Sequence, residues 1–224
     1  MSVKLPSWQC RLLSLSSTDY NMPMTHKTHR RIGIYAGTFD PVHSGHVTFA
    51  LQALQAANLD KVYFLPERQP RNKQNAEHFG HRVAMLNRAI KPHPQFDIIE
   101  LVDVNFSVDR TLPKLQKQFE DDQLVFLFGS DVLAGLQSWP KVERLLSETE
   151  LVIGLRHQDS REDMHKLIEA WPLQPKVLTM FPSYAPEVSS GRVREALRER
   201  KPTNGILTSV ERYSNKNWLY VSLT

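Results

Sequence analysis

Two histidines stand three residues apart within a stretch that reads Gly37-Thr38-Phe39-Asp40-Pro41-Val42-His43-Ser44-Gly45-His46. An apolar run precedes this stretch and a helical pattern follows it, which predicts a turn between a first strand and a first helix. Gly37 lets the backbone pass close to a bulky group, and Pro41 stiffens the loop. At this spacing, the imidazoles of His43 and His46 point the same way from one helical turn. Because free N–H groups at a helix start attract anions, the stretch predicts a phosphate-binding turn.

A second stretch, nearer the carboxyl end, offers similar chemistry and reads Val188-Ser189-Ser190-Gly191-Arg192-Val193-Arg194. Ser189 or Ser190 suits the start of a helix, because a hydroxyl there accepts a hydrogen bond from a backbone N–H. Hydroxyls, free N–H groups and the guanidinium of Arg194 together predict a second anion-binding helix start. Capping alone would also explain the two serines, and that alternative stays open.

From Arg31 onward, short apolar segments alternate with helical patterns. The predicted strands are residues 32–36, 61–65, 97–102, 124–128, 151–155 and 176–180. The predicted helices are residues 44–57, 78–90, 111–120, 142–146, 160–170, 190–200 and 208–216. This alternation predicts an α/β fold with a Rossmann-like, doubly wound parallel sheet and a small helical part at the carboxyl end. Ligands of such sheets bind at the carboxyl ends of the strands, so the residues just after each strand matter most.

Polar segments follow the second and third predicted strands. The first segment carries Lys73 in a basic loop, which could move over a phosphorylated substrate or could be an ordinary surface loop. The second segment offers candidate substrate contacts at Phe106, Ser107, Asp109 and Thr111. Asp109 or Thr111 could instead cap the helix that follows, and both roles can hold at once.

The fourth and fifth predicted strands end in residues that suit a nucleoside. Gly129 would let a base or a ribose approach the strand end, and Asp131 would accept hydrogen bonds from a sugar. Trp139 could stack on a flat, electron-poor ring, or it could be an ordinary core or rim residue. Arg156 directly follows the fifth strand and places a cation there.

The chain has 224 residues, enough for one sizeable α/β domain or two small ones. Residues 1–31 hold five basic residues and one acid, so they carry the whole net charge of +4. The neutral remainder argues against an extended nucleic-acid surface. A single cysteine fits a reducing compartment such as the cytoplasm, and no apolar run is long enough to cross a bilayer. We expect residues 1–30 to form a flexible extension and residues 31–224 to form one domain.

Residues 37–46 match every specified position of the GxFxPxHxGH signature, so the chain resembles the nucleotidylyltransferases, which share a Rossmann-like fold. The resemblance implies that the two histidines contact ATP phosphates and stabilise the transition state of nucleotidyl transfer. It implies ATP binding by Gly37, Thr38, Phe39, His43, Gly45, His46, Gly129, Asp131, Ser189, Ser190 and Arg194. It implies catalytic roles for His43, His46, Lys73 and Arg194. Mg²⁺ is implied to arrive with ATP, held mainly by phosphate and water.

Later segments resemble one branch of that superfamily, the bacterial nicotinate-nucleotide adenylyltransferases. The segments are 105–112, similar to YTVDTL, 129–139, similar to G-x-D with a following Trp, and 188–194, similar to ISSTxIR. The resemblance implies adenylyl transfer from ATP to nicotinate or nicotinamide mononucleotide, giving the dinucleotide and pyrophosphate in NAD biosynthesis. It implies acceptor binding by Lys73, Phe106, Ser107, Asp109, Thr111, Trp139 and Arg156. The chain departs from the branch at Arg71-Asn72, at Arg110 and at Gly191, which stands where a threonine is usual.

Three alternatives stay open at this point. The chain could adenylate phosphopantetheine or use CTP on an alcohol phosphate, or it could bind nucleotides as a regulator without turnover. A zinc site at His43 and His46 would need further ligands, for which His78 and His81 form a similarly spaced pair. The expected partners are ATP and a phosphorylated small-molecule acceptor, with no nucleic acid and no membrane, and a homo-oligomer is left open.

Overall fold

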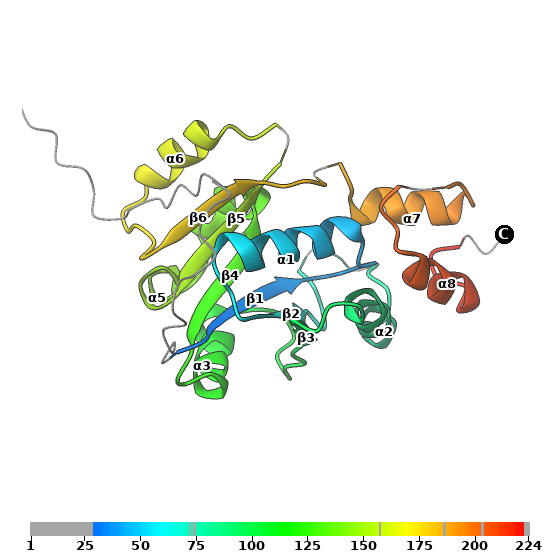
Figure 1. Ribbon diagram of the computed structural model, residues 1–224, viewed down its shortest axis with the longest axis horizontal. Coiled ribbons are helices and arrows are strands. Elements are labelled where there is room, and N and C mark those ends of the chain that lie inside the picture. Colours follow the sequence, from blue (N-terminus) through cyan, green and yellow to red (C-terminus); the bar gives the residue numbers. More distant parts are fainter. Residues whose placement is uncertain are drawn as a thin grey trace, which may run out of the picture.

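A parallel sheet of six strands forms the centre of the fold, as the alternating pattern predicts (Figure 1). Its strands are β1 (Arg31–Gly37), β2 (Lys61–Pro66), β3 (Phe96–Ile98), β4 (Gln123–Gly129), β5 (Glu150–Leu155) and β6 (Leu178–Pro182). Their order across the sheet is β3-β2-β1-β4-β5-β6, and every neighbouring pair is parallel. The computed structural model describes residues 29–71, 73, 75–156, 158–185, 187–202 and 204–221. The flexible extension predicted for residues 1–30 lies outside these residues except for its last two.

Helices cover both faces of the sheet. They are α1 (Ser44–Ala56), α2 (Phe79–Ile90), α3 (Val108–Gln118), α4 (Leu133–Leu136), α5 (Val142–Glu148), α6 (Arg161–Glu169), α7 (Ser190–Arg198) and α8 (Thr208–Lys216), with a short 3₁₀ turn, η1 (Ser130–Val132). Alternate residues of β4 separate the two cores: Phe126 and Phe128 pack in the cluster with α3 to α6, and Val125 and Leu127 pack in the cluster with α1, α2 and α8. Strands buried on both faces read as continuous apolar runs, which explains why the sequence reveals them.

The winding of the chain reverses between β1 and β4, which are neighbours in space but not in sequence. A crevice opens at such a point because the connections after the two strands leave toward opposite faces of the sheet. Figure 1 shows α7 and α8 together at one end of the molecule, past the tip of β1. The backbone N–H of Ser44, at the start of α1, donates to the carbonyl of Gly205 between α7 and α8 over 2.8 Å. The helical carboxyl-terminal part therefore borders the crevice.

Two predicted elements differ from the observed ones by three or more residues at one end. The third strand ends at Ile98 rather than at residue 102, because the following apolar residues leave the sheet and Val102 is 86% exposed. Helix α3 begins at Val108, three residues before its predicted start, because Ser107 has extended backbone and serves as the residue before the first turn. The 3₁₀ turn and α4 were not predicted, since segments of three and four residues are too short to show a helical period.

Candidate active site

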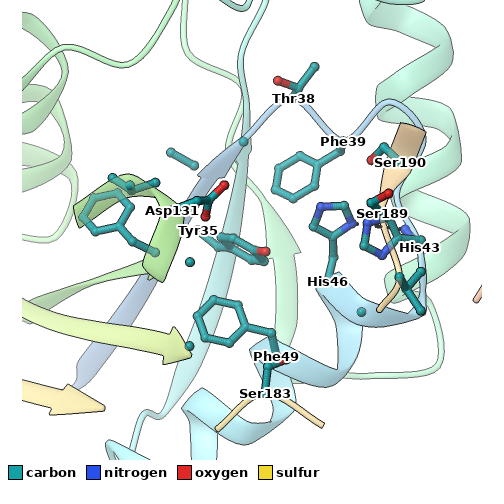
Figure 2. Close-up of a pocket in the computed structure, with 18 of the residues that line it drawn as sticks. Tyr35, Thr38, Phe39, His43, His46, Phe49, Asp131, Ser183, Ser189 and Ser190 are labelled. Atoms are coloured by element: carbon teal, nitrogen blue, oxygen red, sulfur yellow. Dashed lines mark hydrogen bonds between the residues drawn. The ribbon is translucent and has the colours of Figure 1, made fainter. Parts of the chain in front are cut away.

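A cavity of about 580 Å³ opens at the carboxyl ends of β1, β4 and β5 (Figure 2). The turn after β1 and the start of α1 form one wall, the end of β4 with η1 forms another, and the segment from β6 to α7 closes a third. Every residue to which the sequence assigns catalysis or ATP binding lines this cavity: Gly37, Thr38, Phe39, His43, Gly45, His46, Lys73, Gly129, Asp131, Ser189, Ser190 and Arg194. Among the candidate acceptor contacts, Lys73, Phe106, Trp139 and Arg156 line it as well.

The turn after β1 is built around the ring of Phe39. Phe39 is 2% exposed and has a φ of 51°, a conformation that a bulky residue rarely adopts. Its ring folds back under Gly37, where an added Cβ would lie only 3.0 Å from the ring. The ring also meets the His46 imidazole edge-on, with the ring centres 5.1 Å apart. Burial of this ring therefore holds the turn in its rare backbone conformation and packs one side of the His46 imidazole.

The two imidazoles lie side by side, with ring centres 3.7 Å apart (Figure 2). The backbone N–H of His43 donates to Nδ1 of His46 over 3.2 Å, so Nδ1 accepts and the hydrogen of the neutral ring resides on Nε2. Nδ1 of His43 is buried and has no hydrogen-bond partner among the described residues. Gly45 makes room for this pair, because an added Cβ would lie 3.0 Å from the His43 ring.

Burial sets the charge of both rings. It lowers the pKa of His43 to about 4, with a smaller contribution from Arg156. Burial also lowers the pKa of His46 well below its usual range, and the neighbouring His43 and Lys73 add to this effect. Both imidazoles are therefore neutral at pH 7 in the free protein and offer N–H donors without a fixed charge. An anion bound beside them would favour the protonated form.

The start of α7 is fastened to the turn after β1. Ser189 caps the helix by accepting the backbone N–H of Arg192, and Ser190 donates its hydroxyl to the carbonyl of Pro41 over 2.9 Å. Arg194 donates to the carbonyl of Asp40 and lies 3.6 Å from its carboxylate. The starts of α1 and α7 thus face one cavity, and direct hydrogen bonds fix their relative position.

Asp40 is a buried junction beside this cavity. Its carboxylate accepts the hydroxyl of Tyr220 over 2.7 Å and the backbone N–H of Glu77 over 3.2 Å. Burial, followed by the charge of Asp40 and the hydrogen bond to it, raises the pKa of Tyr220, which therefore keeps its proton and donates. The turn after β1, the approach to α2 and the carboxyl-terminal segment consequently meet at one side chain.

The remaining walls suit a nucleoside and a flat ring. Arg156 pairs with Asp131 over 2.9 Å, and both side chains are about half exposed at the mouth of the cavity. Gly129 leaves room for that carboxylate, since an added Cβ would lie 2.5 Å from it. Trp139 meets the rings of Phe106 and Phe128 with centres 5.9 and 5.7 Å away. Trp139 is therefore both a packed residue and a cavity wall, so the two readings of its role are compatible.

Three candidate acceptor contacts, Ser107, Asp109 and Thr111, are not among the cavity-lining residues. They serve the start of α3, which is the capping role that the sequence also allows for Asp109 and Thr111. Ser107 precedes its first turn, and Thr111 is buried, accepts the backbone N–H of Ser107 and donates to Asp103. Asp109 lies exposed in the first turn, where a carboxylate stabilises the helix. The earlier start of α3 explains this outcome, because it turns the three residues into helix-capping and first-turn positions.

Other cavity residues were missed from the sequence. Glu67 directly follows β2 and Ser183 directly follows β6, so the rule that strand ends carry function could have found both. Tyr35 and Phe49 also line the cavity, but they sit within a strand and a helix and read as core residues. Arg71 lies outside the lining and bonds to Asn105, while Asn72 lies outside the described residues.

The described residues hold no group of three or more His, Cys, Asp or Glu side chains that could bind a metal ion. His78 and His81 are used within the fold instead, where Nδ1 of His78 accepts the backbone N–H of Gly80 and Nδ1 of His81 lies 2.9 Å from the Tyr213 hydroxyl. In the same part of the chain, no helix is long and apolar enough to span a membrane.

Known proteins are similar to this chain over most of its length. Residues 34–196 match the family model described as cytidylyltransferase-like. The chain is 35% identical over 201 residues to nicotinate-nucleotide adenylyltransferase of Bacillus subtilis (strain 168), a match that covers 86% of this chain and 100% of the relative. It is 32% identical over 198 residues to a probable nicotinate-nucleotide adenylyltransferase of Neisseria gonorrhoeae (strain NCCP11945), covering 85% and 98%.

The fold also matches a solved structure, Plasmodium falciparum nicotinic acid mononucleotide adenylyltransferase complexed with NaAD. The TM-score is 0.71 at 23% identity, over 86% of this chain and 98% of that chain, so the likeness shows a shared fold. The Rossmann-like sheet predicted from the sequence is thereby confirmed. With its signature turn at a cavity, its family match and its relatives over nearly their whole length, the chain belongs to the cytidylyltransferase-like nucleotidyltransferases and, among them, to the nicotinate-nucleotide adenylyltransferases.

Proposed function

We propose that this chain transfers the adenylyl group of ATP to nicotinate mononucleotide, forming the dinucleotide and releasing pyrophosphate, as a step of NAD biosynthesis. One observation carries the proposal. Two neutral imidazoles at the start of α1 and the serines and guanidinium at the start of α7 line the same cavity, at the switch point of the sheet. This arrangement offers donors to a chain of phosphates from two sides. The names of the relatives from Bacillus and Neisseria supply the acceptor.

In this reaction, a phosphate oxygen of the acceptor attacks the α-phosphorus of ATP in line. The new bond joins that oxygen to the α-phosphorus, while the bond from the α-phosphorus to the bridging oxygen breaks and its electrons leave with pyrophosphate. The attacking oxygen is already anionic, so the site needs no strong base. Catalysis then rests on positioning and on donors aimed at the charge that develops on the phosphates.

We assign the donors by their place in the cavity. His43 and His46 contact the α- and β-phosphates, where their N–H groups stabilise the crowded phosphorus. Lys73, whose ammonium lies 3.0 Å from the Thr38 hydroxyl, and Arg194 at the start of α7 hold the outer phosphates. Asp131 at the end of β4 accepts from a ribose hydroxyl, and Gly129 allows the close approach.

The acceptor occupies the aromatic end of the cavity. Trp139 and Phe106 offer flat apolar surface for a pyridine ring, and Arg156 is the nearby cation at the strand end. An acidic rather than an amide ring substituent follows from the names of the relatives alone. Mg²⁺ enters as part of the substrate MgATP, where it neutralises phosphate charge. In that complex, phosphate and water hold the ion in the main, and no step is assigned to a protein metal site.

A direct assay tests this function against its alternatives. The protein is incubated with Mg²⁺, with ATP or CTP, and with a panel of phosphorylated acceptors, and pyrophosphate is measured. Release with ATP and nicotinate mononucleotide, well above release with the amide, supports the proposal. Release only with phosphopantetheine or only with CTP would replace it by a neighbouring activity. ATP binding in a calorimeter without turnover on any acceptor would identify a regulator.

Gly191 provides a more local test, because it stands at the start of α7 where the branch usually has threonine. An added Cβ there would meet only the Ser189 hydroxyl, at 3.9 Å, so the position has room for a side chain. Gly191→Thr is expected to bind ATP about tenfold more tightly, since one hydrogen bond to a charged phosphate contributes roughly 1.5 kcal/mol. The dissociation constant is measured by calorimetry.

The matched control for this test is Gly191→Ala. Like threonine, alanine removes the excess backbone freedom of glycine, which contributes roughly 0.5–1 kcal/mol of stability. Unlike threonine, it adds no hydroxyl. Alanine and threonine variants with equal affinity for ATP would show that the residue at position 191 does not reach the phosphates.

A further inference from the structure

Arg82 is a buried cation whose role the adenylyl-transfer chemistry leaves unexplained. It lies in the first turns of α2 and is 1% exposed, and among the described residues it is the largest side chain buried to this degree. Its guanidinium donates four hydrogen bonds, and all four go to backbone carbonyl oxygens. The acceptors are Glu77 at 2.8 Å, Thr38 at 2.6 Å, Glu67 at 2.7 Å and Arg68 at 3.0 Å.

These four carbonyls belong to three different places in the chain. Thr38 lies in the turn after β1, within the signature stretch. Glu67 and Arg68 are the first residues after β2, and Glu77 lies just before α2. The segment from 67 to 77 is the loop that carries Lys73. One guanidinium therefore holds both ends of this loop and, with the same group, the turn after β1.

Lys73 and Thr38 also meet at the far side of the loop. The ammonium of Lys73 donates to the Thr38 hydroxyl over 3.0 Å. The loop thus contacts the turn at its tip through a side chain, while its ends are joined to the same turn through Arg82. Because both contacts involve Thr38, a shift at Arg82 would move the tip relative to the phosphate-binding residues that follow Thr38.

Among the standard side chains, only that of arginine fits this arrangement. It presents five N–H donors in one plane, whereas the ammonium of lysine presents three donors from one atom. Burial lowers the pKa of Arg82, and the nearby Asp40 opposes that effect, yet arginine keeps its charge in proteins. Hydrogen bonds from a charged donor are the strong ones, so this junction resists distortion.

We infer that Arg82 is a positioning residue for adenylyl transfer, which fixes the loop carrying Lys73 against the phosphate-binding turn after β1. The inference rests on the proposed function in one respect only, namely that Lys73 acts on the phosphates. Arg82 itself is not among the residues that line the cavity. Its effect on the reaction passes through the position of Lys73 relative to the turn.

The first experiment is a kinetic double-mutant cycle with Arg82→Lys and Lys73→Ala. Arg82→Lys keeps the charge but cannot span four carbonyls, and we expect kcat/KM for ATP to fall by about 10- to 100-fold, since small misplacements cost rates of this size. In the Lys73→Ala background, the same change is expected to cost less than about threefold, because its target is gone. Equal losses in both backgrounds, or a loss below twofold in the wild type, would overturn the inference.

Arg88 supplies the matched control on the same helix. Its side chain is exposed, donates to the carbonyl of Ala84 one turn back and lies over the ring of Tyr213, with its guanidinium carbon 4.1 Å from the ring centre. Arg88→Lys therefore makes the same chemical change on α2 without touching the loop. It is expected to leave kcat/KM within about twofold of the wild type. A loss confined to Arg82→Lys would then come from the contacts of Arg82 and not from an arginine-to-lysine change on α2 in general.

Hydrogen exchange provides a readout that needs no turnover. Arg82→Lys is expected to speed amide exchange in residues 67–77 at least tenfold, with exchange in β4 and β5 unchanged. Unchanged exchange in the loop would contradict the inference, and faster exchange would support it. Both conclusions hold even if the protein turns over no acceptor. Arg82→Gln, which retains a planar donor, is measured beside it. Failure of both variants to fold would assign Arg82 to folding alone and overturn the inference.

Discussion

Replacing His46 by alanine is expected to lower the turnover number for adenylyl transfer by about a hundredfold to a thousandfold. The ring is neutral, its Nδ1 is occupied by the backbone N–H of His43, and its Nε2–H is left to donate to phosphate. Loss of one such preorganised donor in a buried site typically costs 10²–10³ in rate, or roughly 3–4 kcal/mol. Steady-state pyrophosphate release under saturating MgATP measures the effect.

His46→Gln is the informative companion variant. The side-chain amide of glutamine reaches about as far as Nε2, so it can offer an N–H to the same phosphate and is expected to recover part of the lost rate. His93→Ala, at a loop position beyond α2 and outside the cavity lining, serves as the control and should keep normal turnover. Near-normal pyrophosphate release by a folded His46→Ala protein would remove the mechanism proposed for this site.

The free protein is expected to lose stability as the pH falls below 6.5, because His43 resists protonation in the folded state. Its pKa falls from 6.5 in the unfolded chain to about 4 in the fold, chiefly through burial. The unfolded chain therefore binds more protons between these values, and unfolding becomes easier as protons are added. His43 alone should lower the free energy of unfolding by about 2 kcal/mol between pH 7 and pH 5. Below pH 4 its effect stays constant.

Comparison with His43→Asn isolates this contribution from that of the carboxylates. Asparagine retains a nitrogen near the Nδ1 position but does not titrate, so the variant should lose less stability than the wild type on acidification. Urea unfolding curves at pH 7, 6 and 5 give both free energies, and their difference at each pH is the measured quantity. A difference that does not change with pH would show that His43 is not held neutral by the fold.

Much of this architecture can be read from the chain because its signals are local. Continuous apolar runs such as 124–128 predict strands buried on both faces, and the spacing of His43 and His46 places two rings on one helical turn. The segment after β3 was harder, since Leu101 and Val102 look like strand residues but Leu101 packs on the core while Val102 points to solvent. There, hydrogen bonds with the neighbouring loop after β2 determine the backbone conformation.

The contacts that hold the site in place could not be predicted, because they depend on the tertiary structure and not on local sequence patterns. Arg82 reads as an ordinary surface arginine of an amphipathic helix, and its guanidinium is buried against four carbonyls that the fold brings together, that of Thr38 from 44 residues away. For Thr111, the sequence leaves helix capping and substrate contact both open, and the observed start of α3 shows that its hydroxyl accepts from Ser107 and donates to Asp103. Hydrogen bonds that depend on the folded backbone leave no periodic trace in a sequence.

The junction at Asp40 has a consequence for how the enzyme folds during translation. The signature turn leaves the ribosome well before Tyr220, whose hydroxyl donates to the buried Asp40 carboxylate from 180 positions further along the chain. Until Tyr220 is made, this carboxylate lacks one of the hydrogen bonds that it accepts in the folded protein. Chains that stop before Tyr220 should therefore hold the turn, and with it ATP, less firmly than chains that include it.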